Sequence, residues 1–311
     1  MSAAGTDGTD TGAPGTPGAP EPGAPEPAGP GDGAEHGPRT GDTASDGPAA
    51  LPASRTEGDG SAVIRVLSYN VRSLRDDREA LARVIRACAP DLVLVQEAPR
   101  FFRWRKAVAR LARAAELVYV TGGATATGPL ILSSLRARVE RTEDILLPLT
   151  PGLHRRGFAT AVLRFGGARL VAASCHLSLA AAEREAQAGM LLDVLDRQTR
   201  EAGAAYAVVG GDLNDRPGGR AFRRLTGGLR DAWAEAPWGG EYTSTPADPH
   251  QRIDAVLATE GVEILGCGVP LDLDGVSHAD LRAATDHLPV LAALRIPAGP
   301  GARHRGSPAR G

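Results

Sequence analysis

Residues 91–97 read DLVLVQE, and this uninterrupted apolar run, closed by a glutamine and an acid, is the clearest sign of fold class in the chain. Strands that are apolar at every position are typical of sheets covered on both faces. A second β-rich run, VIRVLSY, occupies residues 63–69 and ends in Asn70. Between the two runs, residues 77–88 place apolar side chains at helical spacing before Pro90. The arrangement predicts a strand, a helix and a second strand of an α/β protein.

Periodicity farther along the chain favours a sheet-rich α/β sandwich. Helical spacing returns at residues 101–115 and 180–201. Strand-like runs occupy residues 117–120, 130–132, 139–147, 158–165, 168–175, 207–209, 252–258, 262–266 and 288–295. Because these runs occur both between helices and in hairpin-like pairs, we expect packed mixed sheets rather than one doubly wound parallel sheet.

Composition divides the 311 residues into a folded region and two terminal segments. Residues 1–60 contain 14 glycines, 10 prolines and ten acidic residues, and their only large apolar side chains are Met1 and Leu51. Such a segment cannot bury enough apolar surface to offset an ordering cost of about 1–2 kcal/mol per residue. We therefore expect a disordered acidic tail over residues 1–60, one folded domain over residues 61–297, and a disordered basic tail over residues 298–311.

Charge, cysteine spacing and the search for targeting signals indicate which substrates and which cell compartment to expect. The chain after the acidic segment carries 33 basic and 27 acidic residues, which permits a phosphate-bearing substrate and argues against a protein coated permanently on nucleic acid. Cys88, Cys175 and Cys267 are far apart and form no CxxC pair, so we expect free thiols in a reducing compartment. No signal peptide and no apolar run of about 18 residues is visible. We expect a soluble cytoplasmic monomer without a membrane span.

Polar residues stand at the ends of the apolar strands, where ligands bind in α/β proteins. They are Asn70, Glu97, His176, Asp212, Asn214, Asp254, Asp286 and His287. Four carboxylates cannot all stay ionised within a few ångströms of one another unless a cation joins them. Oxygen donors without a cysteine cluster suit Mg²⁺ or Mn²⁺ better than zinc. The set therefore indicates metal-assisted hydrolysis of a phosphate ester.

Several of these residues also have a purely structural interpretation. Asp254 can pair with Arg252, and residues 210–215 resemble part of a calcium loop but lack its closing Glu. Cys175 and His176 cannot act together as nucleophile and base, because adjacent strand residues point to opposite faces. We therefore expect Cys175 in the core.

Aromatic residues and the other histidines are expected to have structural roles. Phe101, Trp104 and Val108 fit the buried stripe of a helix better than a base-stacking platform. The histidines outside the strand-end set are expected on the surface; they are His36, His154, His250, His278 and His304.

Six motifs occur in order along residues 63–295. They are Tyr69-Asn70, Gln96-Glu97, His176-Leu177, Gly211-Asp212-Leu213-Asn214, Arg252-Ile253-Asp254 and Thr285-Asp286-His287-Leu288-Pro289-Val290. This set resembles the endonuclease/exonuclease/phosphatase superfamily, the group related to deoxyribonuclease I and the exonuclease-III-type AP endonucleases. The resemblance implies a four-layer α/β sandwich of two packed mixed β-sheets flanked by helices, with residues 61–297 as the catalytic domain.

The resemblance also implies a metal and phosphate site. Glu97 would be the principal ligand of Mg²⁺ or Mn²⁺, Asn70 would help to hold the metal or the phosphate, and Asp286 would complete the metal site. Arg156, in an Arg-Gly segment similar to the family's, is a candidate to bind substrate phosphate. Arg72 stands where some family members have a second acid, and it can instead face phosphate.

Five further residues acquire catalytic roles from the resemblance. Asp212 would orient or deprotonate the attacking water, and Asn214 would donate to a phosphoryl oxygen. His287 would contact the scissile phosphate, with Asp254 fixing its tautomer and orientation. His176 would bind a phosphate oxygen or assist the leaving group.

The implied activity is divalent-metal-dependent hydrolysis of phosphate esters by in-line attack of water. A basic segment and two tryptophans give a slight preference for a nuclease; they are Arg216, Arg220, Arg223, Arg224, Trp233 and Trp238. The alternative is a phosphatase or sphingomyelinase-like hydrolase of a small-molecule or lipid phosphoester. A catalytically dead binding module of the same fold would require loss of Glu97, Asp212 or His287, and all three are present. A serine hydrolase is disfavoured because no Gly-x-Ser-x-Gly motif occurs.

Overall fold

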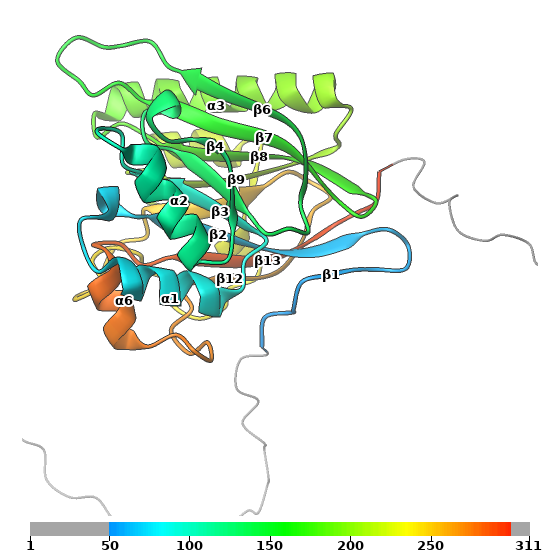
Figure 1. Ribbon diagram of the computed structural model, residues 1–311. Helices are drawn as coiled ribbons and strands as arrows, with labels where there is room; N and C mark the ends of the chain where they lie inside the picture. Colours follow the sequence, from blue (N-terminus) through cyan, green and yellow to red (C-terminus); the bar gives the residue numbers. More distant parts are fainter. Residues whose placement is uncertain (1–49, 300–311) are drawn as a thin grey trace, which may run out of the picture. The chain divides into compact units, whose positions relative to one another are not determined.

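The computed structural model describes residues 50–299, which form two packed mixed sheets (Figure 1). The first sheet contains β1 (Arg55–Thr56), β2 (Ala62–Asn70), β3 (Leu92–Gln96), β4 (Val118–Gly122), β5 (Leu130–Ser133), β12 (Glu263–Gly268) and β13 (Val290–Ile296). Its strands run in the order β12-β13-β2-β3-β5-β4, with β1 paired to β2. The β2–β3 pair is parallel, and the other neighbours are antiparallel.

The second sheet repeats this plan with a central parallel pair. It contains β6 (Arg138–Leu146), β7 (Gly157–Phe165), β8 (Ala168–His176), β9 (Tyr206–Asp212), β10 (Arg230–Asp231) and β11 (Asp254–Ala258), in the order β10-β11-β9-β8-β7-β6. Here β8 and β9 are parallel and the remaining pairs are antiparallel. The predicted mixed sheets are confirmed, and each contains one parallel pair whose carboxyl ends lie at the same edge.

Hydrogen bonds join the two parallel pairs across the layer between the sheets. Gln96 Nε2 donates to Ser174 Oγ (3.3 Å) and to Gly210 O (3.4 Å), and Ser174 Oγ donates to Val95 O (2.6 Å). A Cβ at Gly210 would lie 2.7 Å from Leu94 Cδ1, so glycine permits the close approach of β9 to β3. These contacts fix β3 against β8 and β9 directly beneath the edge where the strands end.

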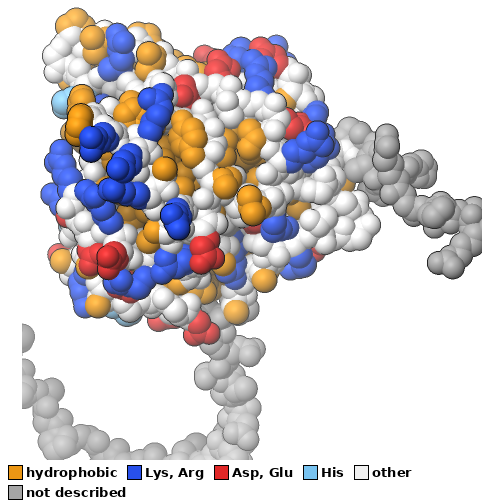
Figure 2. Space-filling model, in the orientation of Figure 1, with side chains coloured by type: hydrophobic (Ala, Val, Ile, Leu, Met, Phe, Trp, Pro, Cys, Tyr) orange, Lys and Arg blue, Asp and Glu red, His pale blue; other side chains and the backbone are white. Residues whose placement is uncertain are grey.

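Helices cover the outer face of each sheet and complete a four-layer sandwich (Figure 1). On the first sheet lie α1 (Arg78–Cys88), α2 (Trp104–Ala114) and α6 (His278–Ala284). On the second lie α3 (Ala181–Ala202) and α4 (Arg220–Thr226). The short elements are η1 (Arg72–Leu74), η2 (Gly123–Ala126) and α5 (Ala232–Glu235). Figure 2 shows lysine and arginine side chains gathered over α1 and α2 on the solvent side.

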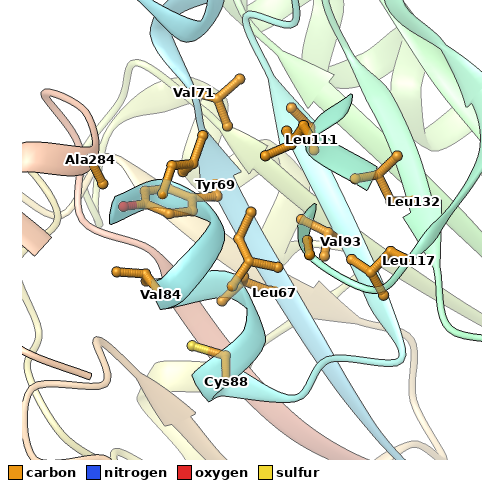
Figure 3. Close-up of a cluster of buried hydrophobic side chains, with 14 of the residues drawn as sticks. Leu67, Tyr69, Val71, Val84, Cys88, Val93, Leu111, Leu117, Leu132 and Ala284 are labelled. Carbon is orange, nitrogen blue, oxygen red and sulfur yellow. The ribbon is translucent and has the colours of Figure 1, made fainter. Parts of the chain in front are cut away.

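Local sequence accounts for the first helix. The Asp77 carboxylate accepts from the backbone N–H groups of Glu79 and Ala80 and so caps the start of α1. The buried face of α1 carries Leu81, Val84, Ile85 and Cys88, at the spacing noted in the sequence. These side chains belong to the core that also contains the apolar residues of β2 and β3, and the close-up shows Val84 and Cys88 beside Leu67 of β2 (Figure 3).

The helix expected over residues 101–115 begins later than expected. Arg103 has a left-handed backbone (φ 58°), and α2 starts at Trp104. Phe101 therefore falls outside the helical periodicity, and its side chain is 80% exposed rather than buried in a core stripe. That expectation was wrong for Phe101, whereas Val108 is buried and Trp104 packs against the core.

The expected boundaries of the folded domain also shift. Leu51 is buried, and β1 pairs with β2, so the segment from Leu51 to Thr56 belongs to the fold rather than to the expected tail. Arg65 holds this segment by donating to Leu51 O (2.8 Å) and Pro52 O (3.0 Å). Near the other terminus, Ala298 forms a β-bridge with Ala168. The expectations for residues 1–49 and 300–311 fall outside the described residues.

Within residues 50–299, every helix is too short or too polar to cross a lipid bilayer.

Cys88, Cys175 and Cys267 are all buried and unpaired with one another. Burial raises the pKa of the Cys88 thiol to about 12, so this group stays protonated at neutral pH.

We expect Leu51→Ala to lower the free energy of unfolding by about 2–4 kcal/mol, because the substitution opens a cavity beside β12 and β2. Leu135→Ala is the matched control, since Leu135 is 88% exposed and should change stability by less than about 0.5 kcal/mol. Urea unfolding of both variants measures the difference. Equal unfolding midpoints for the two variants would contradict the assignment of Leu51 to the core.

Candidate active site

Strand pairing brings the polar strand-end residues together at one edge of the sandwich. In the parallel register, Asn70 is paired with Gln96, and His176 is paired with Asp212. Asp254 is paired with Asp212 from the other side, across the antiparallel neighbour β11. Asp212 is therefore flanked by a histidine and a carboxylate on adjacent strands.

Asn70 links the two sheets at this edge. Its side-chain Nδ2 donates to Asp212 Oδ2 (2.9 Å) and to Glu97 Oε1 (3.3 Å), while its Oδ1 accepts from the backbone N–H of Arg72 (3.1 Å). Asn70 is buried, so each of its polar atoms uses a protein partner. The amide fixes the distance between a carboxylate of the first sheet and one of the second.

Glu97 follows β3 with a left-handed backbone (φ 53°), a costly conformation for a residue other than glycine. Neighbouring hydrogen bonds hold it: Ser73 N–H donates to Glu97 O (2.7 Å), and Ala98 N–H donates to Gly128 O (2.9 Å). The Glu97 side chain is 39% exposed, and one oxygen accepts only the long bond from Asn70. This carboxylate is thus held in place with most of its coordination capacity free.

Asp286 lies on the other side of Asn70. Thr285 Oγ1 donates to the backbone oxygen of Asn70 (3.1 Å) and lies 3.3 Å from Asp286 Oδ1. Arg72 Nε is 3.1 Å from Asp286 Oδ2, and its Nη1 donates to Asp76 (3.3 Å). The expectation that Arg72 faces phosphate is therefore replaced by an ion pair with Asp286, because two carboxylates lie within reach of its guanidinium.

His287 and Asp254 form a buried hydrogen-bonded pair. His287 Nδ1 is 2.8 Å from Asp254 Oδ2, and His287 Nε2 is 3.8 Å from Asp212 Oδ2. Burial by itself would lower the pKa of His287, but Asp254 and then Asp212 and Asp286 outweigh it and raise this pKa to about 10. His287 therefore carries a proton at neutral pH and presents a positive charge towards Asp212.

Arg252 does not compete for Asp254, as the structural interpretation of the sequence had allowed. Its guanidinium is buried against Asp231, with 2.9 Å between Nη1 and Oδ2, and its Nε is 3.6 Å from Glu241. The carboxylate of Asp254 is left to His287, and its other oxygen is buried without a hydrogen-bond partner.

His176 differs from His287 in charge. Its Nε2 is 3.4 Å from Asp212 Oδ2, and its Nδ1 is 4.0 Å from Glu97 Oε1. Burial lowers the pKa of His176 despite the attraction of these carboxylates. The site thus combines a neutral histidine and a protonated one on either side of Asp212. Cys175, the residue before His176, points into the core as expected.

A pocket of about 300 Å³ opens over these groups. It is lined by Ser73, Glu97, Arg100, Thr127, His154, Arg156, His176, Leu179, Asp212, Asn214 and His287. Arg156 is half-buried, its Nε has no hydrogen-bond partner, and burial lowers its pKa. Asn214 has a left-handed backbone (φ 48°) and donates from Nδ2 to Leu177 O (3.0 Å), leaving one amide hydrogen for a ligand.

Five wall residues of the pocket were not expected from the sequence; they are Ser73, Arg100, Thr127, His154 and Leu179. Arg100, His154 and Leu179 lie on loops whose orientation no periodic pattern reveals, although Arg100 closely follows the Gln96-Glu97 motif. A separate groove of about 340 Å³ between α1 and α2 contains four arginines and Glu79 but no histidine or asparagine. Its lining lacks the acid–base groups that the strand-end pocket holds.

The donor set fits a hard divalent cation. Glu97 offers an open carboxylate in the pocket lining, beside Asn70, whose Nδ2 donates to Glu97 and whose Oδ1 accepts from Arg72 N–H, and no cysteine lies in that lining. Ligand atoms of Asp212, Asp254 and His287 also lie within 4.8 Å of one another. In that second group, however, the 2.8 Å contact of His287 with Asp254 already uses an atom of each residue. Glu97 is the more open carboxylate, and its unused lone pairs could take a cation.

Asp254→Asn should lower the pKa of His287 by removing the carboxylate that does most to raise it. The imidazole, protonated throughout the neutral range in the parent protein, should then titrate between about pH 6 and pH 8. NMR of the His287 ring in EDTA measures this change. Asp248→Asn, at a carboxylate 92% exposed beside His250, is the control and should leave His287 unaffected. An unchanged His287 titration in Asp254→Asn would contradict the pairing.

Comparisons with known proteins agree with this geometry. A model of the "Endonuclease/Exonuclease/phosphatase family" matches residues 67–287. Among solved structures, an endonuclease/exonuclease/phosphatase from Bacteroides vulgatus has 18% identity and a TM-score of 0.62, covering 75% of this chain and 99% of its own. A mannosyl-6-phosphatase from Bacteroides thetaiotaomicron has 17% identity and a TM-score of 0.63, covering 74% and 99%.

Truncated TDP2 from Caenorhabditis elegans has 20% identity and a TM-score of 0.57, covering 75% of this chain and 97% of its own. No curated protein matches the chain. At these identities the solved structures establish the fold alone, whereas the family model covers most of the sequence and every strand-end motif from Asn70 to His287. The chain belongs to the endonuclease/exonuclease/phosphatase family.

Proposed function

We propose that this protein is a divalent-metal-dependent hydrolase of phosphate esters. The observation that carries the proposal is the position of Asp212, which contacts Asn70 and His176 and faces protonated His287 at the floor of one pocket. Glu97 and Arg156 border the same pocket. A carboxylate base, an open metal ligand and cationic groups around one cavity are what phosphoryl transfer requires, because that reaction depends mainly on positioning and charge stabilisation.

Glu97 would hold Mg²⁺ or Mn²⁺ together with Asp286 and with Asn70, whose Oδ1 accepts from Arg72 N–H and keeps one lone pair. When bound there, the cation would polarise the phosphoryl group and neutralise its developing charge. Arg72 neutralises part of the charge of Asp286, so this carboxylate is a weaker ligand than Glu97.

Asp212 is the general base of the proposed reaction. Its Oδ1 accepts from Asn214 N–H (3.1 Å) and its Oδ2 from Asn70, which fixes the carboxylate while leaving lone pairs for a water molecule. The water oxygen attacks phosphorus in line with the departing oxygen, and Asp212 takes the proton of the water.

His287 and Asn214 stabilise the phosphoryl oxygens. The imidazolium of His287 supplies charge, Asp254 keeps it oriented, and the free amide hydrogen of Asn214 supplies a donor. His176, being neutral, contributes a ring N–H and no net charge. Arg156 is the further candidate for a non-bridging phosphate oxygen, since its guanidinium lines the pocket with an unpartnered Nε.

The residues that gave a slight preference for a nuclease do not border the pocket. Arg220 is paired with Glu185 of α3 (2.8 Å), and Trp233 and Trp238 pack against core residues. The proposed activity therefore covers a nuclease and the alternative phosphatase or sphingomyelinase-like hydrolase alike. Monomeric state and cytoplasmic location stay predictions.

Turnover should require Mg²⁺ or Mn²⁺ and disappear in EDTA, because the carboxylates of Glu97 and Asp212 line the same pocket. The assay panel contains duplex, abasic and single-stranded DNA, RNA, inositol phosphates, sphingomyelin and aryl phosphates. Glu97→Gln should raise the metal concentration for half-maximal turnover at least about tenfold. Glu116→Gln, an exposed acid at the far end of α2, is the control. Full turnover in EDTA would overturn metal dependence, and turnover of no member of the panel would overturn the activity.

Asp212→Asn should reduce turnover at least about 10²-fold, because the amide keeps the shape of the side chain but cannot accept the proton. His287→Ala should cause a loss of similar size by removing the cation that faces the phosphate. Steady-state kinetics on the best substrate of the panel measure both, and thermal unfolding shows whether each variant stays folded. A folded Asp212→Asn protein with near-parental turnover would refute its role as base.

A further inference from the structure

Large apolar side chains project into solvent from three loops around the active-site pocket. Phe101 and Phe102, 80% and 87% exposed, lie between β3 and α2. Leu179, 74% exposed, lies between β8 and α3, and Leu149 and Leu153, 51% and 37% exposed, lie between β6 and β7. Arg100, His154, Arg156 and Leu179 of the same loops line the pocket itself. Leu179 thus lines the pocket, and the other four apolar side chains lie on loops that supply its wall; these loops are called the entrance.

Hydrogen bonds hold these loops in shape with the apolar side chains outward. Gln187 Oε1 accepts from Ser178 N–H (2.8 Å), and Arg184 Nη1 donates to Leu179 O (2.9 Å). Between β6 and β7, Leu147 N–H donates to Arg156 O (3.0 Å) and Leu153 N–H to Thr150 O (3.0 Å). These side chains are therefore exposed on ordered backbone. Exposing apolar surface to water costs free energy, and a partner that buried this surface would remove that cost.

Cationic side chains accompany the apolar ones. Residues 98–106, 147–156 and 177–180 contain six, and no Asp or Glu; they are Arg100, Arg103, Arg105, Lys106, Arg155 and Arg156. Arg100 lies 5.6 Å from the ring centroid of Phe101, and Arg103 lies 5.0 Å from that of Phe102. The start of α2 belongs to the face on which basic side chains gather in Figure 2. These loop segments therefore combine apolar tips with cationic side chains, around a pocket whose lining also holds Glu97 and Asp212.

We propose that this entrance docks on an anionic phospholipid surface, so that the phosphoester substrate is a lipid headgroup. The proposal rests on the phosphoester hydrolase function proposed above. Apolar side chains set among lysines and arginines, on loop segments that contain no acid, match the boundary between acyl chains and anionic headgroups. Docking in this way would bring the pocket to the level of the headgroup phosphates.

The aliphatic side chains favour a lipid surface over single-stranded nucleic acid. Bases bind to proteins by stacking on aromatic rings, and Phe101 and Phe102 offer two such rings. Leu149, Leu153 and Leu179 cannot stack on bases, but they can enter hydrocarbon. The leucines on two of the three loops therefore favour a lipid surface over single-stranded nucleic acid as the partner.

Co-sedimentation of the full chain with vesicles of phosphatidylcholine and about one quarter phosphatidylglycerol tests the proposal. The parent protein should bind, and binding should weaken in high salt. The double substitution F101S/F102S should lower vesicle affinity at least about tenfold, because both rings leave the interface. Leu135→Ser is the matched control: Leu135 is 88% exposed after β5, at the opposite end of the strands, and its loss should change nothing.

Two further measurements separate this proposal from the proposed activity. Asp212→Asn should bind vesicles like the parent protein, since docking does not use the catalytic base. Turnover of a soluble aryl phosphodiester by the parent protein tests the activity alone. No vesicle binding, or equal binding by F101S/F102S and the parent, would overturn the docking surface. Binding of single-stranded DNA that depends on Phe101 and Phe102, without vesicle binding, would overturn it in favour of nucleic acid.

Discussion

The site depends on how the chain keeps several carboxylates close together. Glu97, Asp212, Asp254 and Asp286 converge where two sheets meet, and like charges at such distances repel one another strongly unless positive charge or hydrogen bonds compensate them. Three of them have clear compensation. Asp254 has the imidazolium of His287, Asp286 has Arg72, and Asp212 accepts from Asn70 and Asn214. Glu97 has only one long hydrogen bond, so it is the carboxylate with the most capacity left for the cation of the proposed function.

The two packed sheets hold these carboxylates at fixed positions. Each sheet has one parallel pair at its centre, and the two pairs are joined by the bonds of Gln96 and Ser174 across the inner layer. Because parallel strands end at the same edge, residues that follow or terminate β2, β3, β8 and β9 meet there without long loops. The cost of the buried amides and hydroxyls is offset by the hydrogen bonds between the sheets. The same bonds limit how far the two halves of the site can move apart.

Much of the fold and site was predictable because both depend on short-range pattern. Apolar runs marked the strands, and their polar ends marked Asn70, Glu97, Asp212 and His287, since a strand end places a side chain at the edge of a sheet. Contacts distant in sequence were harder to foresee. The pairing of Arg252 with Asp231 and of Arg72 with Asp286 depends on which acids the tertiary fold brings within reach.

Three further differences between the structure and the expectations from sequence concern Phe101, Leu51 and the loops of the pocket. The helical spacing of residues 101–115 is genuine, but the left-handed Arg103 interrupts it, so Phe101 lies in solvent beside the pocket. Leu51 is a lone apolar residue in a segment rich in glycine and proline, and composition could not show that it packs against the first sheet. Arg100, His154 and Leu179 occupy loops, whose course is set by individual contacts such as the bond from Arg184 to Leu179 O rather than by periodicity.

Anomalous diffraction from crystals grown with Mn²⁺ would locate the ion without reference to turnover. We expect a peak at about 2–2.5 Å from a carboxylate oxygen of Glu97, with Asn70 or Asp286 beside it. A Mn²⁺ peak confined to the group of Asp212, Asp254 and His287, or no peak at this edge of the sheets, would contradict this expectation.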